Sequence, residues 1–223
     1  MTYEHALVIG ASGGIGAALA AALAGRSARV STLSRSADGL DISSQHSVDA
    51  ALDRLGGPFD LVVVATGALQ IDGAGPEKAL RQIDAQAMAA QFALNAIGPA
   101  LVLRHAPRLL PRERRAEFAV LSARVGSIAD NRLGGWYSYR ASKAAVNQIV
   151  HTAAIEIART HPEAVLAALH PGTVATAFTE KFVAPGKATP PEEAARNLLA
   201  VLASLRPEDT GGFFDYSGAR VPW

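Results

Sequence analysis

A glycine-rich turn near the start of the chain restricts its fold more than any other feature. Gly10, Gly14 and Gly16 span the junction between an apolar run, Ala6–Gly10, and an alanine-rich run, Ile15–Ala24. Glycine lets the backbone turn sharply and approach a pyrophosphate closely, and a helix N-terminus offers unpaired N–H groups at its positive dipole end. Strand, glycine turn and helix in this order predict a nucleotide-binding unit, and a purely structural turn is the weaker alternative.

The rest of the chain alternates short apolar runs with longer helical stretches. We expect strands at Ala6–Gly10, Arg29–Leu33, Leu40–Ile42, Leu61–Ala65, Phe118–Leu121, Val165–Leu169 and Phe213–Phe214. We expect helices at Ile15–Ala24, Val48–Leu55, Lys78–Ala85, Ala87–Leu109, Ser138–Ile157 and Glu192–Leu205. This alternation predicts an α/β fold, a Rossmann-like doubly wound parallel sheet flanked by helices. Because no linker or repeat interrupts it, we expect a single domain over residues 1–223.

Composition argues against several classes of protein. The formal net charge of +1 creates no field that would attract nucleic acid or an anionic membrane, and the basic run Arg104–Arg115 is interpreted as a solvated turn. Without cysteine there are no disulfides or thiolate sites, and no metal is expected. No uninterrupted apolar stretch reaches about 18 residues, and Met1–His5 leaves no room for a signal peptide. We therefore expect a cytoplasmic protein that binds neither nucleic acid nor membrane.

Tyr139 and Lys143 are the strongest catalytic candidates. Their i, i+4 spacing in the expected helix Ser138–Ile157 places both side chains on one face. A nearby ammonium favours the phenolate and lowers the pKa of a tyrosine, so Tyr139 would serve as an acid for carbonyl reduction or a base for alcohol oxidation. Alone, such a pair is usually an ordinary surface feature; here the glycine turn and the α/β pattern favour catalysis.

The end of the second expected strand bears on the choice of nucleotide. It reads Ser34, Arg35, Ser36, without the Asp or Glu that would accept a hydrogen bond from a ribose 2′-hydroxyl. A guanidinium at this place suits a 2′-phosphate instead. NADP(H) is therefore favoured and NAD(H) is possible, with a solvated Arg35 as the alternative interpretation.

The chain resembles the short-chain dehydrogenase/reductase family over its whole length. The glycine spacing G-x-x-x-G-x-G, Tyr139 and Lys143 carry the resemblance, and the segments 124–128, 134–140 and 221–223 place it closest to C-factor and sniffer-type carbonyl reductases. The resemblance implies an oxidoreductase that interconverts a small carbonyl compound and its alcohol by hydride transfer, as a homodimer or homotetramer. It also implies an alternative, a C-factor-like signalling or regulatory protein that binds the nucleotide with little turnover.

The resemblance also assigns residues to the site. Tyr139 would transfer the proton, Lys143 would lower its pKa and bind the nicotinamide ribose, and Asn95 would hold a water in a proton relay unless it is only a buried helix residue. Asp41 would accept from the adenine ring, or alternatively cap the next helix. The expected cofactor contacts are Gly10, Ser12, Gly13, Gly14, Ile15, Gly16, Ser34, Arg35, Asp41, Ile42, Ala65, Thr66, Gly67, Asn95, Tyr139, Lys143, Pro171, Gly172, Val174 and Thr176.

One position departs from the family pattern. In the family, an active-site serine that polarises the substrate oxygen usually closes the fifth strand. The register places Ala123 at that position in this chain. Ser122 is the expected replacement, provided a twist or bulge turns it toward the site, because successive strand residues face opposite sides. Ser127 is the second candidate, and water or Asn95 alone the third. The segment 177–189, which contains Phe178, Phe182, Val183, Pro185 and Gly186, is expected to line the substrate pocket.

Overall fold

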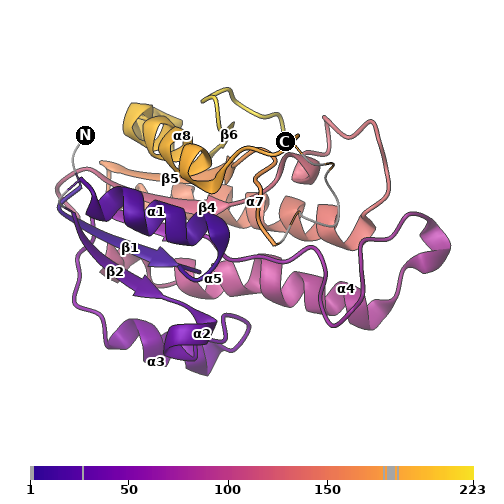
Figure 1. Ribbon diagram of the computed structural model, residues 1–223. Helices are drawn as coiled ribbons and strands as arrows, with labels where there is room; N and C mark the ends of the chain where they lie inside the picture. The colour runs from indigo at the N-terminus through magenta and orange to yellow at the C-terminus, as the bar shows by residue number, and fades with distance from the viewer. Residues whose placement is uncertain (1–2, 27, 178, 180–183, 185) are drawn as a thin grey trace.

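The residues described by the computed structural model, 3–26, 28–177, 179, 184 and 186–223, include six parallel strands in one sheet (Figure 1). Their order is β2-β1-β3-β4-β5-β6. The strands are β1 His5–Ile9, β2 Arg29–Leu33, β3 Leu61–Val64, β4 Ala116–Leu121, β5 Ala164–His170 and β6 Gly212–Asp215. The order reverses between β1 and β3, and open parallel sheets bind ligands at such a switch point. The predicted Rossmann-like sheet is confirmed.

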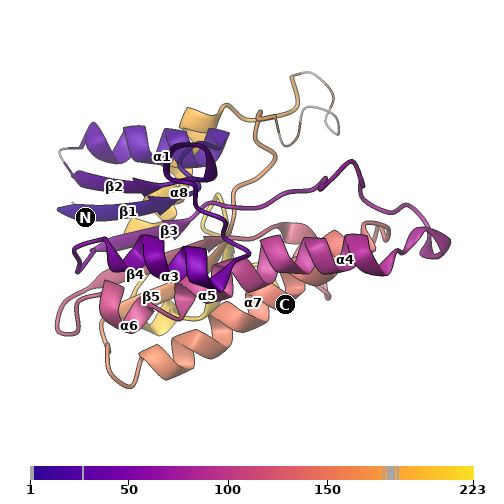
Figure 2. The same ribbon diagram turned by 90° about the horizontal axis from the view of Figure 1, so that it is seen from below.

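Helices cover both faces of the sheet (Figures 1 and 2). On one face α1, Gly14–Ala24, packs beside α8, Pro191–Ser204, over a core that contains Leu19, Leu198 and Leu202. The opposite face carries α3 Gln45–Asp53, α4 Ala85–Phe92, α5 Gly98–Leu103 and α7 Tyr137–Ile157. Short helices α2, Arg35–Asp38, and α6, Ala106–Leu109, lie in the connections. Both faces of every central strand are therefore buried, which explains the continuous apolar runs.

A π-helical turn, Ala93–Ile97, joins α4 to α5, so that the two form one continuous helix from Ala85 to Leu103. By length and composition alone this helix is able to cross a membrane. In this fold its Ala96, Val102 and Leu103 pack into the core below the sheet.

Two expected elements are not formed as predicted, and the expected helix Ala87–Leu109 ends at Leu103, before the short α6. Leu40–Ile42 is not a strand: Leu40 and Ile42 are buried under the helices, and a Cβ on Gly98 would lie 3.0 Å from three atoms of Ile42. Both residues are apolar because they pack under α5, and an apolar run of this length is also typical of a short strand. The expected helix Lys78–Ala85 is only a 3₁₀ turn, Leu80–Gln82, because the Gln82 side chain accepts from two backbone N–H groups and Asp84 caps α4.

The segment after β6 turns back against that strand. Phe214 and Arg220 form an antiparallel bridge, and the N–H of Val221 donates to the carbonyl of Phe213 at 2.8 Å. Trp223 stacks on Phe213, with ring centroids 5.9 Å apart, and its carbonyl accepts from the N–H of Ala129. This tail therefore covers the outer edge of β6.

Candidate active site

A cavity of about 300 Å³ lies at the carboxyl ends of the central strands. Ligand sites in proteins usually have volumes of this order or larger. It brings together residues that are far apart in the chain: Ser12, Gly13, Gly14, Ile15, Ala65, Thr66, Gly67, Leu121, Ser122, Ala123, Tyr139, Lys143, His170, Pro171, Gly172, Val174, Thr176, Ala177 and Thr179. Most of the predicted contacts around the glycine turn, the β3 end and the β5 loop thus share one cavity.

The glycine turn is shaped by close backbone contacts. Gly10 has φ +91°, and a Cβ there would lie 2.9 Å from the Ala65 backbone; one on Gly16 would lie 2.2 Å from the Gly10 carbonyl oxygen. A Cβ on Gly14 would lie 2.5 Å from the side chain of Thr176. The first turn of α1 contains no acidic side chain. The helix N-terminus therefore faces the cavity with its positive end uncompensated by its own first turn.

Tyr139 and Lys143 lie on α7 and are almost fully buried, at 6% and 3% exposure. The Lys143 ammonium donates to the Leu121 carbonyl at 2.9 Å and lies 5.9 Å from the centroid of the Tyr139 ring. Burial raises the pKa of Tyr139 and lowers the pKa of Lys143 to about 8. Removal from water favours the neutral form of both groups, so burial opposes the expected lowering of the Tyr139 pKa by Lys143, and that role of Lys143 stays a prediction.

Asn95 occupies the π turn, and its side chain makes three hydrogen bonds. Its Oδ1 accepts from the N–H of Ala68 at 3.0 Å, and its Nδ2 donates to the Ala68 carbonyl at 2.9 Å and to Gln91 Oε1 at 2.6 Å. Gln91 in turn donates to the Leu69 carbonyl at 3.0 Å. A Cβ on Gly67 would lie 3.0 Å from Asn95 Oδ1 and 3.4 Å from Lys143 Nζ, so this glycine lets both side chains approach the β3 end. Gln91 was missed, although its i, i+4 spacing to Asn95 was visible.

The serine candidates point in different directions. Ser122 lines the cavity, yet its hydroxyl donates to Asn147 Oδ1 of α7 at 2.5 Å. The Ser127 hydroxyl accepts from the N–H of Asp130 at 3.0 Å. Ala123 itself lines the cavity. Ser122 therefore lines the cavity, but its proton is engaged by a residue that sequence reasoning missed, one helical turn beyond Lys143, and its catalytic role stays a prediction.

His170, the last residue of β5, is a second residue that sequence reasoning missed. It lines the cavity, its ring packs edge-on against Tyr216, and its buried Nδ1 has no hydrogen-bond partner among the described residues. Burial, reinforced by the charge of Arg124, lowers the pKa of His170 to about 4. A neutral imidazole therefore lies on the cavity wall at neutral pH. The signal was its position directly before Pro171 and Gly172.

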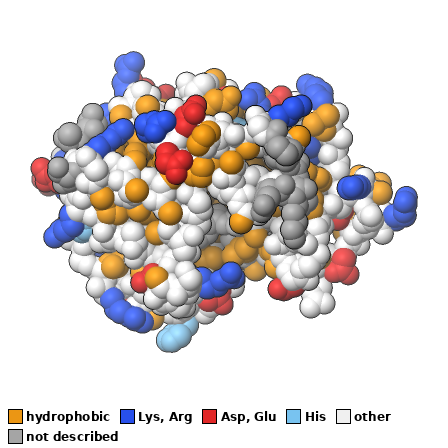
Figure 3. Space-filling view, viewed as in Figure 1, with side chains coloured by type: hydrophobic (Ala, Val, Ile, Leu, Met, Phe, Trp, Pro, Cys, Tyr) orange, Lys and Arg blue, Asp and Glu red, His pale blue; other side chains and the backbone are white. Residues whose placement is uncertain are grey.

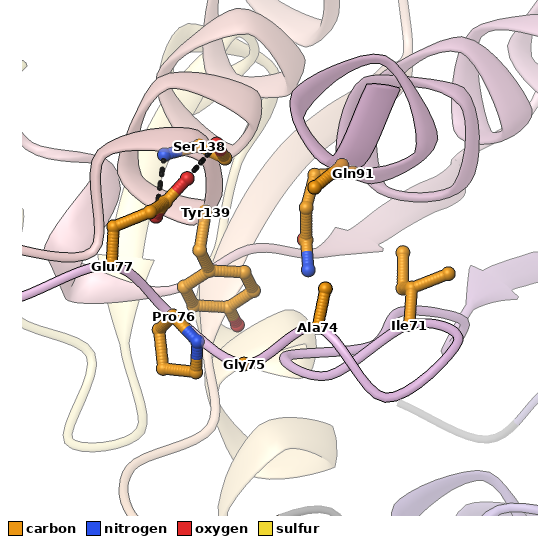
Figure 4. A pocket seen from close by; sticks show the side chains of 9 residues that line it. Ile71, Ala74, Gly75, Pro76, Glu77, Gln91, Ser138 and Tyr139 are labelled. Carbon is orange, nitrogen blue, oxygen red and sulfur yellow. Dashed lines mark hydrogen bonds between the residues drawn. The ribbon is translucent and has the colours of Figure 1, made fainter. Parts of the chain in front are cut away.

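The loop between β3 and α4 forms a wall beside Tyr139 (Figure 4). The Tyr139 ring lies between Pro76 and Gln91, and the Glu77 carboxylate meets Ser138. The Ser138 N–H and hydroxyl both donate to Glu77, and the N–H of Trp136 donates to the Glu77 carbonyl at 2.5 Å. Glu77 thereby caps the N-terminus of α7, whose first turn has no acidic side chain of its own. No local sequence pattern indicated this contact.

At the β2 end, local hydrogen bonds organise the chain. Arg35 is exposed at the start of α2, while Ser34 is buried and its hydroxyl accepts from the N–H of Ala37 at 3.1 Å. The Ser34 N–H donates to Asp38 Oδ2 at 2.7 Å. The expectation that this strand end has no carboxylate is therefore wrong, because α2 returns one after a single turn.

Asp41 lies beyond α2 and is exposed. Its Oδ1 accepts from the N–H and hydroxyl of Ser43, and Ser44, not Asp41, caps α3. The alternative role of Asp41 as a helix cap is therefore wrong, and its adenine role stays a prediction. Ile42 is buried.

The expected substrate segment is only partly described. Phe178, Phe182, Val183 and Pro185 lie outside the described residues. On either side of them, Val174 and Thr189 form a parallel bridge, and the N–H of Ala175 donates to the Thr189 carbonyl at 2.9 Å. Both ends of the segment are therefore fixed at the cavity mouth.

Comparisons with known proteins agree with this geometry. The family model described as short chain dehydrogenase matches residues 4–186. The chain is 37% identical to C-signal of Myxococcus xanthus over 171 residues, covering 75% of this chain and 94% of that protein. It is 33% identical to 1-hydroxy-2-glutathionyl-2-methyl-3-butene dehydrogenase of Rhodococcus sp. (strain AD45) over 188 residues, covering 83% and 79% respectively.

Solved structures share the fold. The NADPH-bound carbonyl reductase from chicken fatty liver superposes with a TM-score of 0.86 at 22% identity, covering 100% of both chains. Carbonyl reductase Sniffer of Drosophila melanogaster superposes with a TM-score of 0.84 at 18% identity, covering 99% of both chains. At these identities the likeness concerns the fold, and together with C-signal it confirms the resemblance seen in the sequence.

Proposed function

The chain belongs to the short chain dehydrogenase family of oxidoreductases, and we propose that it is an NADP(H)-dependent reductase of a small carbonyl compound. The observation that carries the proposal is the single cavity that joins the glycine turn of α1 to the buried pair Tyr139 and Lys143. One end of this cavity suits a pyrophosphate, and the other holds a proton donor. Few proteins other than nicotinamide-dependent oxidoreductases need a pyrophosphate site and a proton donor in one cavity.

The residues present fit a dinucleotide. Gly10 and Gly16 leave no room for side chains along the turn, and Gly13 begins α1 without a side chain of its own. The buried Thr66 hydroxyl lines the cavity without a partner among the described residues, as a group that awaits a ligand would. The chicken reductase is NADPH-bound, but the preference for NADP(H) rests on Arg35, which is exposed beside the β2 end.

When bound, NADPH supplies the hydride that adds to the carbonyl carbon. Tyr139 gives its hydroxyl proton to the carbonyl oxygen, which completes the alcohol; in the reverse direction it takes that proton back. Lys143, held by the Leu121 carbonyl, binds the nicotinamide ribose and favours the tyrosinate left after proton transfer. Asn95, fixed by Ala68 and Gln91, holds the water that returns a proton.

Ser122 is our candidate for the hydroxyl that polarises the substrate oxygen. Its proton now goes to Asn147, so donation to a substrate requires the hydroxyl to rotate away from that partner. We also propose that the protein acts in the cytoplasm as one domain over residues 1–223, as a homodimer or homotetramer, with neither nucleic acid nor membrane as a partner. On the face seen in Figure 3, side chains of both charges are interspersed.

The second candidate function is signalling, because C-signal of Myxococcus xanthus is 37% identical to this chain. In that case the cavity would bind a nucleotide with little turnover. Steady-state oxidation of NADPH against a panel of aldehydes, ketones and quinones separates the two functions. Turnover that is lost in Tyr139→Phe supports the reductase; tight NADPH binding with no turnover across the panel supports the signalling protein.

A further inference from the structure

Asp38 takes both hydrogen-bond donors that Ser34 presents at the end of β2. The Ser34 N–H and hydroxyl donate to the same oxygen, Asp38 Oδ2, at 2.7 and 3.2 Å. Ser34 is buried, at 4% exposure, so these donors are built into the fold. Gly39, with φ +67°, ends α2 after one turn and returns Asp38 to the strand end. An anion of the chain itself therefore occupies the Ser34 donors.

Arg35 adds a guanidinium to the same strand end. It follows Ser34 directly, its side chain is exposed, and it has no ion pair with Asp38 or with any other described carboxylate. A hydroxyl, a backbone N–H and a guanidinium are the donors that a phosphate monoester needs. The same hydroxyl and N–H are filled by a carboxylate, which repels a phosphate placed next to it.

We propose that Asp38 is a specificity-determining residue that competes with the 2′-phosphate of NADP(H) for Ser34. This inference rests on the proposed function. A 2′-phosphate must displace the carboxylate before it reaches the Ser34 N–H and hydroxyl. The 2′-hydroxyl of NAD(H) carries no charge and leaves the carboxylate in place. Asp38 thus weakens NADP(H) binding selectively and reduces the preference for NADP(H) over NAD(H) that Arg35 creates.

The test measures nucleotide binding without any substrate. Dissociation constants of NADPH and NADH are obtained by fluorescence titration for the wild-type protein, Asp38→Asn and Asp38→Ala. Adenosine 2′,5′-bisphosphate and AMP, which differ only in the 2′-phosphate, repeat the comparison at this end of the nucleotide alone. Asp53→Asn, an exposed aspartate of α3, gives the same change in net charge away from Ser34.

We expect Asp38→Asn and Asp38→Ala to tighten NADPH and the bisphosphate by about three- to tenfold, the effect of removing one like charge beside the 2′-phosphate. NADH and AMP should change less than about twofold, as should every ligand in Asp53→Asn. Unchanged NADPH binding, equal tightening of NADPH and NADH, or weaker NADPH binding in a variant that keeps the wild-type melting temperature would each overturn the inference. If the wild type binds and oxidises NADPH but Asp38→Asn leaves NADPH binding unchanged, only this inference fails. If the wild type binds neither NADPH nor NADH, the proposed function fails as well.

Discussion

The catalytic end and the adenine end of the proposed site are built in opposite ways. At the catalytic end, hydrogen bonds join buried residues far apart in sequence: Lys143 with Leu121 across 22 positions, Asn95 with Ala68 across 27, and Ser122 with Asn147 across 25. At the adenine end they join near neighbours, Ser34 with Asp38 across 4 positions and Asp41 with Ser43 across 2. In the function that we propose, the geometry of proton transfer would therefore depend on the whole fold, whereas the choice of nucleotide would depend on one short loop.

This difference means that substitutions at the two ends should have separable effects. Changes at the catalytic end should alter the rate constant for turnover or the stability of the fold. Changes in the loop after β2 should alter nucleotide affinity alone, because few of its contacts reach beyond six residues. Four variants test this separation, in order of decreasing effect.

Tyr139→Phe should have the largest effect. It removes one hydroxyl from a buried ring and little volume, so kcat should fall by at least about 10²-fold, the contribution of a general acid. The dissociation constant for NADPH should stay within about twofold. Tyr137→Phe, two residues earlier on the same helix, is the matched control. Retention of more than about a tenth of the wild-type kcat would contradict the proposed role of Tyr139.

Lys143→Met should remove turnover and stabilise the fold. Burial lowers the pKa of Lys143 to about 8, against about 10.4 in an unfolded chain. Between these pKa values the unfolded state binds more protons, so the free energy of unfolding should rise as the pH increases from about 8 to 10. Below about pH 8 the buried ammonium should lower the free energy of unfolding by up to about 3 kcal/mol. Loss of the bond to the Leu121 carbonyl offsets part of the gain.

Denaturant unfolding at several pH values measures this effect. The wild type should show the rise above pH 8, and Lys143→Met should not. Lys78→Met, at an exposed position, should follow the wild type. A Lys143→Met protein that is less stable than the wild type at pH 7 would mean that the buried ammonium contributes more through its contacts than it costs through desolvation.

Arg35→Ala should act on the nucleotide alone. Loss of an exposed guanidinium that meets a phosphate should weaken NADPH by about tenfold or more and NADH by less than about twofold. The saturated kcat and the melting temperature should be unchanged, since no described hydrogen bond or ion pair of the fold uses this side chain. Arg54→Ala, another exposed arginine, serves as control. Equal weakening of both nucleotides would remove the assignment of NADP(H).

Ser122→Ala should have the smallest effect of the four variants. A well-placed donor to a developing oxyanion is worth about 10²-fold or more, but here the hydroxyl must first leave Asn147, so we expect a loss of about tenfold in kcat. Ser127→Ala should stay within about threefold, because its hydroxyl holds the turn to Asp130. If both variants keep wild-type kcat, the serine role is struck out and the signalling function gains support.

Sequence reasoning worked where the spacing of residues along the chain indicates their function. The glycines at 10, 14 and 16 and the pair Tyr139 and Lys143 needed only a strand, a turn and a helix to be placed, and the structure brings Gly14, Tyr139 and Lys143 to one cavity. The fold class followed in the same way, because apolar runs of strand and helix length alternate throughout the chain.

Residues held by tertiary contacts could not be found in this way. Asn147 and Glu77 act through partners that only packing brings near, and His170 matters because the sheet register places it on the cavity wall. Asp38 escaped notice for a different reason: its position depends on Gly39 adopting a left-handed conformation that ends α2 after one turn. The burial that raises the pKa of Tyr139 is likewise not visible in the spacing of two side chains.

The tail that folds back on β6 also affects how this sheet meets other chains. An outermost strand exposes unpaired N–H and C=O groups, and such an edge can template the addition of a strand from another molecule. Here Val221 and the bridge between Phe214 and Arg220 already use part of that edge, so the chain supplies its own terminating strand. Among the described strands, β2 keeps the other edge, where Arg29, Ser31 and Thr32 are polar. Aggregation through growth of the sheet is therefore opposed at one edge by pairing and at the other by polar side chains.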